Sequence, residues 1–224
     1  MKGMTGWLAL GIAAAGLAGA QSAVAAEADL VSYEDDAMEL YRPVLDQYNT
    51  ALLEQWSMQE YAAAGLCALC AYYTNPSQVG YWLEDVDNNG TEELLVGETE
   101  AQGEAGGMIF QLYAVYGQTP VLIASSTENS RYYLCTDGII AKEEFDGAES
   151  LFAYYMADSD NAVLTLTEAV IYDGTQEGET PWFYSRTGTD VSDAMPVFEA
   201  DAIEIMDSHE HEAIEYLAFA DYGI

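Results

Sequence analysis

The fold of this chain is decided by one stretch of sequence, Arg131-Tyr132-Tyr133-Leu134-Cys135-Thr136-Asp137-Gly138-Ile139-Ile140-Ala141. Residues with high strand propensity lie on both sides of the dipeptide Asp137-Gly138. Such a dipeptide favours a primed two-residue turn, whose positive φ angles bring two strands back against each other. The stretch therefore predicts a tight antiparallel hairpin.

Short apolar runs and turn residues alternate on both sides of this hairpin. Runs that recur every ~8–12 residues are typical of an antiparallel meander. The 17 tyrosines suit a pleated surface that is buried on one side only. The predicted strands are Tyr81–Leu83, Leu94–Val96, Met108–Tyr116, Val121–Ser125, Leu151–Met156, Val163–Tyr172 and Pro181–Ser185.

Two helices are predicted before the first strand. Apolar residues recur every three to four positions from Ala37 to Trp56, which is the period of an amphipathic helix. Ser57 and Glu60 form a capping-box pattern that starts a second helix, and this helix is expected to reach Tyr73. Because the connection is so short, the two helices are expected to form a hairpin.

The last part of the chain predicts one more helix, from about Val197 to His209, and a final strand from Ala213 to Phe219. We therefore expect an α+β fold, in which an N-terminal helical hairpin packs on an antiparallel β-meander with a further C-terminal helix and strand. Residues 27–78 form the helical region and residues 79–224 the β-rich region, and both are expected to belong to one domain.

Residues 1–26 have the pattern of a cleavable secretion signal. Lys2 gives a positive start, an apolar run extends from Trp7 to Ala20, and Ala23-Val24-Ala25-Ala26 offers small residues to a signal peptidase. The apolar run is shorter than the ~20 residues that a membrane-spanning helix needs. We expect a secreted, extracellular protein with no membrane insertion after cleavage.

The chain is strongly acidic, with 39 Asp and Glu residues against 5 Lys and Arg residues and a formal net charge of −34. Such a surface repels phosphate backbones, so the composition excludes nucleic-acid binding. It attracts divalent cations or basic partners. The alternative interpretation is that the acidity only keeps an exported protein soluble.

Three cysteines, Cys67, Cys70 and Cys135, exclude a fully paired disulfide framework. Cys67 and Cys70 have the CxxC spacing of a redox centre, but such a centre lies at a helix N-terminus. Here the pair falls inside the second predicted helix, and zinc would need two further ligands. The favoured interpretation is a pair of small buried core residues.

The stretch Asp85-Val86-Asp87-Asn88-Asn89-Gly90-Thr91-Glu92-Glu93 carries the clearest chemistry. Oxygen-bearing side chains lie at positions 1, 3, 5 and 9, a glycine at position 6 permits a sharp bend, and position 7 can offer its carbonyl. Ca²⁺ takes six to eight hard oxygen ligands, so this spacing predicts one structural calcium ion. The predicted ligands are Asp85, Asp87, Asn89 and Glu93 through their side chains and Thr91 through its backbone.

Two alternatives compete with this calcium site. An EF-hand would place a bidentate Glu at position 12, where this chain has Val96, so an EF-hand is not expected. A plain hairpin is the second alternative, because Asn89-Gly90 alone can make a type I′ turn. It does not explain acidic residues at ligand spacing.

Residues 85–96 resemble the strand–loop–strand calcium sites of FG-GAP and VCBS-type repeats, which read D-x-D-x-[DN]-G-x-x-[DE] before two or three aliphatic residues. The resemblance implies the same five ligands. It covers one copy of the motif and implies no propeller. The whole layout resembles uncharacterised secreted proteins of Gram-positive gut bacteria, which implies an extracellular setting and no particular activity.

A second candidate site is His209-Glu210-His211-Glu212, because alternating histidines with a carboxylate could hold zinc or nickel. The favoured interpretation is a solvated acidic segment. No G-x-S-x-G motif is present, and with so many acids a glycosidase-like carboxylate pair cannot be singled out.

The leading hypothesis is a secreted, acidic, calcium-binding protein that acts as a non-enzymatic binding or structural module. Its Tyr-rich sheet would bind a protein or glycan partner. The alternatives are a secreted hydrolase with an unidentified carboxylate pair, and an inhibitor or sensor module that docks on a basic protein.

The secretion signal makes a direct prediction. Mass spectrometry of the exported protein should find a chain that starts at Ala26 or Glu27, because the small residues before Glu27 form the cleavage site. A membrane-bound chain that retains Met1 would contradict cleavage.

Overall fold

The computed structural model describes residues 37–99, 107–176 and 180–223, so the predicted signal at 1–26 lies outside the described residues. Residues 40–224 form one compact unit. Within the described residues, no helix is long and apolar enough to cross a membrane.

The helical front begins with a helix over residues 37–54, whose buried face includes Tyr41, Leu45 and Tyr48. The second helix, α2 (Met58–Ala63), has the predicted capping box, in which Ser57 and Glu60 exchange hydrogen bonds. It is much shorter than predicted, so the hairpin has one long and one short arm.

The early end of α2 has a local cause at Gly65, which adopts a φ of 77°. The Leu66 N–H donates to the Tyr61 carbonyl (2.9 Å) and the Gly65 N–H to the Ala62 carbonyl (3.1 Å), the two bonds of a Schellman motif. The expected extension to Tyr73 is therefore wrong.

The cysteine pair consequently does not lie inside an α-helix. Cys67 is the N-cap residue of a separate 3₁₀ helix, η1 (Ala68–Tyr72), and Cys70 lies within it. Both side chains are buried, so the prediction that Cys67 and Cys70 are core residues is confirmed. Cys135 is buried as well.

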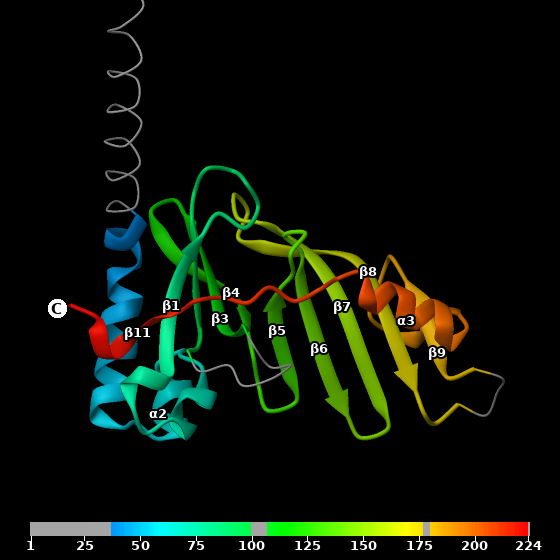
Figure 1. Cartoon of the computed structure of the whole chain (residues 1–224), viewed down its shortest axis with the longest axis horizontal. Coiled ribbons are helices and arrows are strands. Elements are labelled where there is room, and N and C mark those ends of the chain that lie inside the picture. The colour runs from blue at the N-terminus through cyan, green and yellow to red at the C-terminus, as the bar shows by residue number, and fades with distance from the viewer. Residues whose placement is uncertain (1–36, 100–106, 177–179, 224) are drawn as a thin grey trace, which may run out of the picture. The chain divides into compact units, whose positions relative to one another are not determined.

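The rest of the unit is dominated by an 11-stranded antiparallel sheet, which confirms the predicted α+β class (Figure 1). Its strands are β1 (Val79–Glu84), β2 (Glu93–Glu98), β3 (Met108–Tyr116), β4 (Thr119–Ser125), β5 (Ser130–Leu134), β6 (Ile140–Asp146), β7 (Glu149–Asp158), β8 (Val163–Asp173), β9 (Trp182–Ser185), β10 (Met195–Pro196) and β11 (Leu217–Ala218). Among the described residues, the 3₁₀ helix η2 (Pro76–Gln78) precedes β1, η4 (Val191–Asp193) connects β9 to β10, and η5 (Phe219–Asp221) follows β11.

The β5–β6 hairpin forms as predicted, with Leu134 opposite Ile140, but its turn differs. In this turn Gly138 has a positive φ (78°), whereas Asp137 does not have one. The Gly138 N–H donates to the Cys135 carbonyl (2.9 Å). The connection is therefore a longer turn that ends in a left-handed glycine, and the primed two-residue turn is wrong.

The strand order departs from a simple meander at β3. This strand pairs with β5 near its start, where Met108 lies opposite Tyr133, and with β4 further along, where Gln111 lies opposite Ser125. The remaining strands follow the order β10-β9-β8-β7-β6-β5-β3-β2-β1-β11. The branch at β3 places β4 outside this row.

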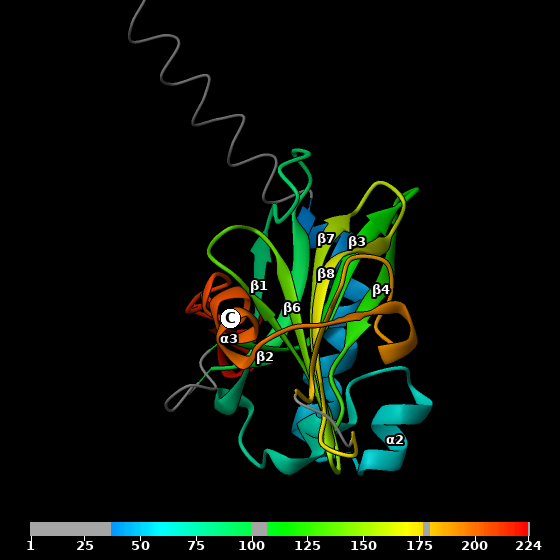
Figure 2. The same ribbon diagram turned by 90° about the vertical axis from the view of Figure 1, so that its right-hand side faces the viewer.

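The C-terminal part crosses the sheet after α3 (Glu199–Asp207). Residues 208–218 run over the strands in front of the sheet in Figure 1. They form a bridge between Cys135 and His211 and end in β11 on the edge strand β1. Figure 2 shows α3 on one side of the sheet and α2 on the other. The predicted strand Ala213–Phe219 is reduced to two residues, because this segment crosses the strands and does not lie along them.

Tyr216 is held by two glycines that face each other across β1 and β2. Gly80 lies opposite Gly97, and a Cβ atom on Gly97 would lie 2.3 Å from Cζ of Tyr216. The Tyr216 hydroxyl donates to the Met108 carbonyl (3.3 Å). The absence of side chains on the two glycines therefore creates the space that the ring fills.

This packing predicts that Gly97→Ala destabilises the protein, although alanine has the less flexible backbone. Overpacking typically costs about 1–3 kcal/mol, and urea unfolding should show a loss of that size. In a Tyr216→Ala background the same substitution should cost less, since the contacts with the ring are gone and only the approach of the Cβ atom to the Met108 carbonyl (2.5 Å) remains. Equal costs in both backgrounds would contradict the packing argument.

Candidate metal centre

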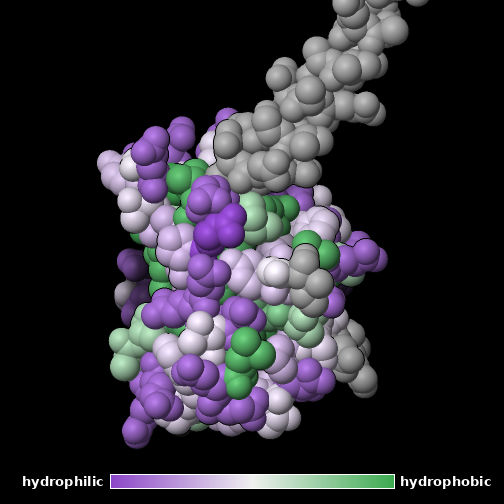
Figure 3. All heavy atoms as spheres, turned by 90° about the vertical axis from the view of Figure 1, so that its left-hand side faces the viewer, coloured by the Kyte–Doolittle hydropathy of each residue, from purple (hydrophilic) through white to green (hydrophobic). Residues whose placement is uncertain are grey.

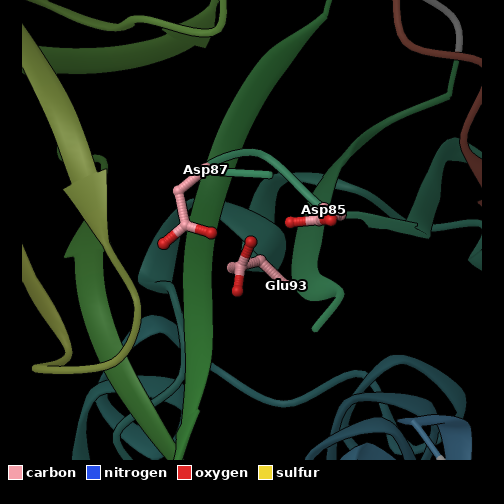
Figure 4. Close-up of side chains that lie close together, drawn as sticks. All are labelled: Asp85, Asp87 and Glu93. Carbon is pink, nitrogen blue, oxygen red and sulfur yellow. The ribbon is translucent and has the colours of Figure 1, made fainter. Parts of the chain in front are cut away.

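The acidic loop connects β1 to β2, whose last paired residues are Glu84 and Glu93. Asp85, Asp87 and Glu93 each offer one carboxylate oxygen, and these oxygens lie within 4.8 Å of one another. Figure 4 shows the three carboxylates pointing toward a common centre. Three of the five predicted ligands therefore come together.

Backbone N–H groups hold the two aspartates of the loop in place. The N–H groups of Asn89 and Gly90 donate to the two oxygens of Asp85 (3.0 and 2.9 Å). The Asn89 N–H also approaches Asp87 (3.2 Å). Positive φ occurs at Asn88 (58°) and Gly90 (89°) but not at Asn89, so the alternative of a type I′ turn at Asn89-Gly90 is wrong.

Asn89 and Thr91 are engaged within the loop. The Asn89 side chain accepts from the Thr91 N–H (2.7 Å) and donates to Asp87 (3.3 Å). In this conformation Asn89 positions Asp87. The roles of Asn89 and Thr91 as direct ligands stay predictions.

Glu93 is the unusual member of the group because its side chain is fully buried. Its Oε2 accepts from the Val86 N–H (3.0 Å), whereas its Oε1 has no hydrogen-bonding partner. Burial raises the pKa of Glu93 to about 7, and the charges of Asp87 and Asp85 act in the same direction. The Ser159 side chain and the Val86 N–H oppose this rise in pKa.

Ser159 belongs to the site although sequence reasoning missed it. This residue lies in the turn after β7, and its N–H donates to Asp87 Oδ2 (2.8 Å). Its hydroxyl is buried without a hydrogen bond of good geometry, although it is near enough to lower the pKa of Glu93. No local signal could reveal it, because Ser159 and Asp87 are 72 positions apart.

The arrangement suits a hard divalent cation. All three converging groups are carboxylates, which favours Ca²⁺ or Mg²⁺ over metals that prefer nitrogen and sulfur. A pocket of about 300 Å³ adjoins the loop, and its lining includes the carboxylate residues Glu84, Asp85, Asp137 and Glu212. Their negative potential attracts cations toward the loop.

The histidines at 209 and 211 do not form a second metal site. The His209 ring stacks on Tyr154 (4.0 Å between centroids), and its two nitrogens lie 3.0 Å from Asp137 and 3.1 Å from Glu168. His211 stacks on Tyr133 (4.0 Å). The interpretation of this segment as solvated is wrong, because only 9% of the His209 side chain is exposed.

Among the residues that the structure describes, the acidic loop is the one group of three or more potential metal-binding side chains. No protein-family model, curated protein or solved structure matches this chain. Function is therefore argued from the geometry of the loop, and the resemblance to FG-GAP and VCBS-type loops stays a prediction.

The raised pKa of Glu93 makes a prediction for the metal-free protein. The folded state favours the protonated carboxyl, so this stabilising effect is complete below pH ~4.5 and is lost as the pH rises through 7. In EDTA, the free energy of unfolding should fall over this range by up to about 3 kcal/mol more in the parent than in Glu93→Gln. Urea unfolding at a series of pH values measures the difference. The same pH dependence in both proteins would contradict the assignment.

Proposed function

We propose that residues 85–93 bind one structural Ca²⁺ ion in a secreted, acidic, non-enzymatic binding or structural module. The observation that carries this proposal is the convergence of three carboxylates, of which Glu93 is buried and has one oxygen without a hydrogen-bonding partner. The direct ligands are Asp85, Asp87 and Glu93, while Asn89 and Thr91 are added from their spacing.

A bound cation removes an energetic conflict in the loop. A buried carboxylate oxygen without a partner is costly, and two neighbouring carboxylates increase the cost. Hydrogen bonds from backbone N–H groups hold Asp85 and Asp87 but leave Glu93 Oε1 without a partner. An ion with a charge of +2 satisfies that oxygen and offsets the repulsion among the three side chains.

The proposed ion also connects two distant parts of the sheet. Asp87 accepts a hydrogen bond from the Ser159 N–H, so a cation that fixes Asp87 also fixes the turn between β7 and β8. The ion is therefore structural in character. Extracellular calcium modules bind with Kd on the order of 10⁻⁴–10⁻³ M, which suits the predicted secretion.

Partner binding is the less specific part of the proposal. Figure 3 shows a face covered mainly by hydrophilic side chains, with small separate hydrophobic patches. On β6–β9, by contrast, aromatic rings form two edge-to-face pairs, Phe145 with Phe152 and Tyr172 with Trp182. A protein or glycan that contacts these rings fits the module. An inhibitor or sensor role against a basic protein rests on the net charge of −34.

A hydrolase is the second candidate, and one observation favours it. Glu93 has a pKa of about 7 beside two other carboxylates, a pattern that acid–base catalysts share. However, Glu93 has no exposed surface, so a substrate cannot reach it in this conformation.

The calcium proposal predicts a rise in melting temperature on addition of millimolar Ca²⁺. At ten times Kd the stabilisation is about 1.4 kcal/mol, from RT ln(1 + [L]/Kd). Asp87→Asn should abolish the rise, because it removes the charge of one ligand. Asparagine keeps one side-chain oxygen that can accept from the Ser159 N–H.

Asp160→Asn is the matched control. It removes the same charge from an exposed position beside Ser159, so the response to calcium should survive. Identical melting of the parent in EDTA and in excess Ca²⁺ would overturn the proposal.

A further inference from the structure

Cys67 and Cys70 lie together at the start of η1. The Cys70 N–H donates to the Cys67 carbonyl (3.2 Å), which closes one 3₁₀ turn. Side chains three positions apart eclipse each other in such a turn. The two thiols are near enough that each shifts the pKa of the other.

The surroundings of the turn hold this arrangement. The Tyr48 hydroxyl accepts from the Cys67 N–H (3.1 Å), and the Cys67 thiol points to the Ser126 carbonyl (3.5 Å). Cys70 has no exposed surface, and Cys67 is 1% exposed. The fold therefore fixes both the backbone and the side chains of the pair.

We infer that Cys67 and Cys70 form an intramolecular disulfide, and that the folded chain favours this bond over the unfolded chain. The fold already holds the two cysteines in one closed turn, whereas the unfolded chain must lose conformational entropy to bring them together. Oxidising extracellular conditions, which the predicted secretion implies, allow such bonds to persist.

The bond forms by thiol–disulfide exchange with a small disulfide such as oxidised glutathione. One thiol of the pair loses its proton, and its sulfur attacks one sulfur of the oxidant, which releases one thiol. The other thiol of the pair then loses its proton, and its sulfur displaces the second thiol. The cysteine pair loses two protons and two electrons, and the oxidant gains them. Because both thiols are buried in the folded state, the exchange takes place before the core closes.

The two thiols have unequal acidities in the folded state. The hydrogen bond from the Cys70 thiol lowers the pKa of Cys67, with the backbone N–H of Leu69 acting in the same direction against burial. Burial raises the pKa of Cys70 well above its ordinary value. In the folded state Cys67 is therefore the more acidic thiol of the pair.

Cys135 provides an internal comparison, because it lies in another part of the core. It packs with Tyr133, Ala141 and Tyr154, and its sulfur points to the His209 carbonyl (3.8 Å). Burial raises its pKa to about 12. Cys135 is expected to stay a free thiol under conditions that oxidise the pair.

The test measures oxidation of the full chain at several ratios of oxidised to reduced glutathione. The chain is equilibrated in concentrated urea, and separately after dilution from urea into native buffer, starting from both reduced and oxidised material. Intact mass and peptide mapping then report the bond. The equilibrium constant for losing two hydrogens should be at least about tenfold larger in native buffer. The oxidised protein should correspondingly melt at a higher temperature than the reduced protein.

Two variants make the outcome specific. Cys135→Ala should leave the constant unchanged, whereas Cys70→Ser should remove the bond and leave Cys67 free or joined to glutathione. An equal or smaller constant in native buffer would overturn the inference. A disulfide that includes Cys135 would overturn it as well.

Discussion

The amide side chain of Gln111, buried in the middle of β3, holds the helical front on the sheet. Its carbonyl oxygen accepts hydrogen bonds from the hydroxyls of Tyr48 and Tyr113, and its amide donates to the Gly65 carbonyl (3.1 Å). Tyr48 in turn accepts from the Cys67 N–H. One buried side chain therefore connects the first helix, the end of α2 and the cysteine turn. A buried network of this kind stabilises the fold only when every member is paired, because each unsatisfied polar group costs about 1–3 kcal/mol.

The burial of Glu93 in the acidic loop depends on the same first helix. The Tyr41 hydroxyl, on the same helix as Tyr48, donates to the carbonyls of Glu92 (2.9 Å) and Tyr113 (3.2 Å), which fixes the start of β2 against β3. The first five residues of β2 are buried, and Glu93 is the first of them. Its side chain has no exposed surface, because the acidic loop folds back over it. The raised pKa of Glu93 therefore follows from where the strand begins.

Features encoded by neighbouring residues could be predicted from the sequence, and features encoded by distant residues could not. The capping box, most strand positions and the three converging carboxylates depend on spacings of a few residues. The Schellman motif at Gly65 was also local, and the glycine that ends α2 could have been recognised. The contact of Ser159 with Asp87, the position of β4 and the crossing of residues 208–218 depend on how the sheet closes. The stacking of His209 on Tyr154 likewise follows from that crossing, so sequence patterns alone indicated a solvated segment.

The crossing segment also determines the order in which the chain can fold. Phe219, which is 1% exposed, stacks on Tyr48 (5.8 Å between centroids) and packs against Tyr81 (5.3 Å), while Tyr216 fills the space between Gly80 and Gly97. A ribosome or an export channel delivers a polypeptide from its N-terminus. Tyr48 and Tyr81 therefore emerge long before Phe219, which packs against them. Contacts over such long separations in sequence close slowly. The late arrival of residues 216–219 therefore delays closure of the core, which would keep the chain open during the predicted export.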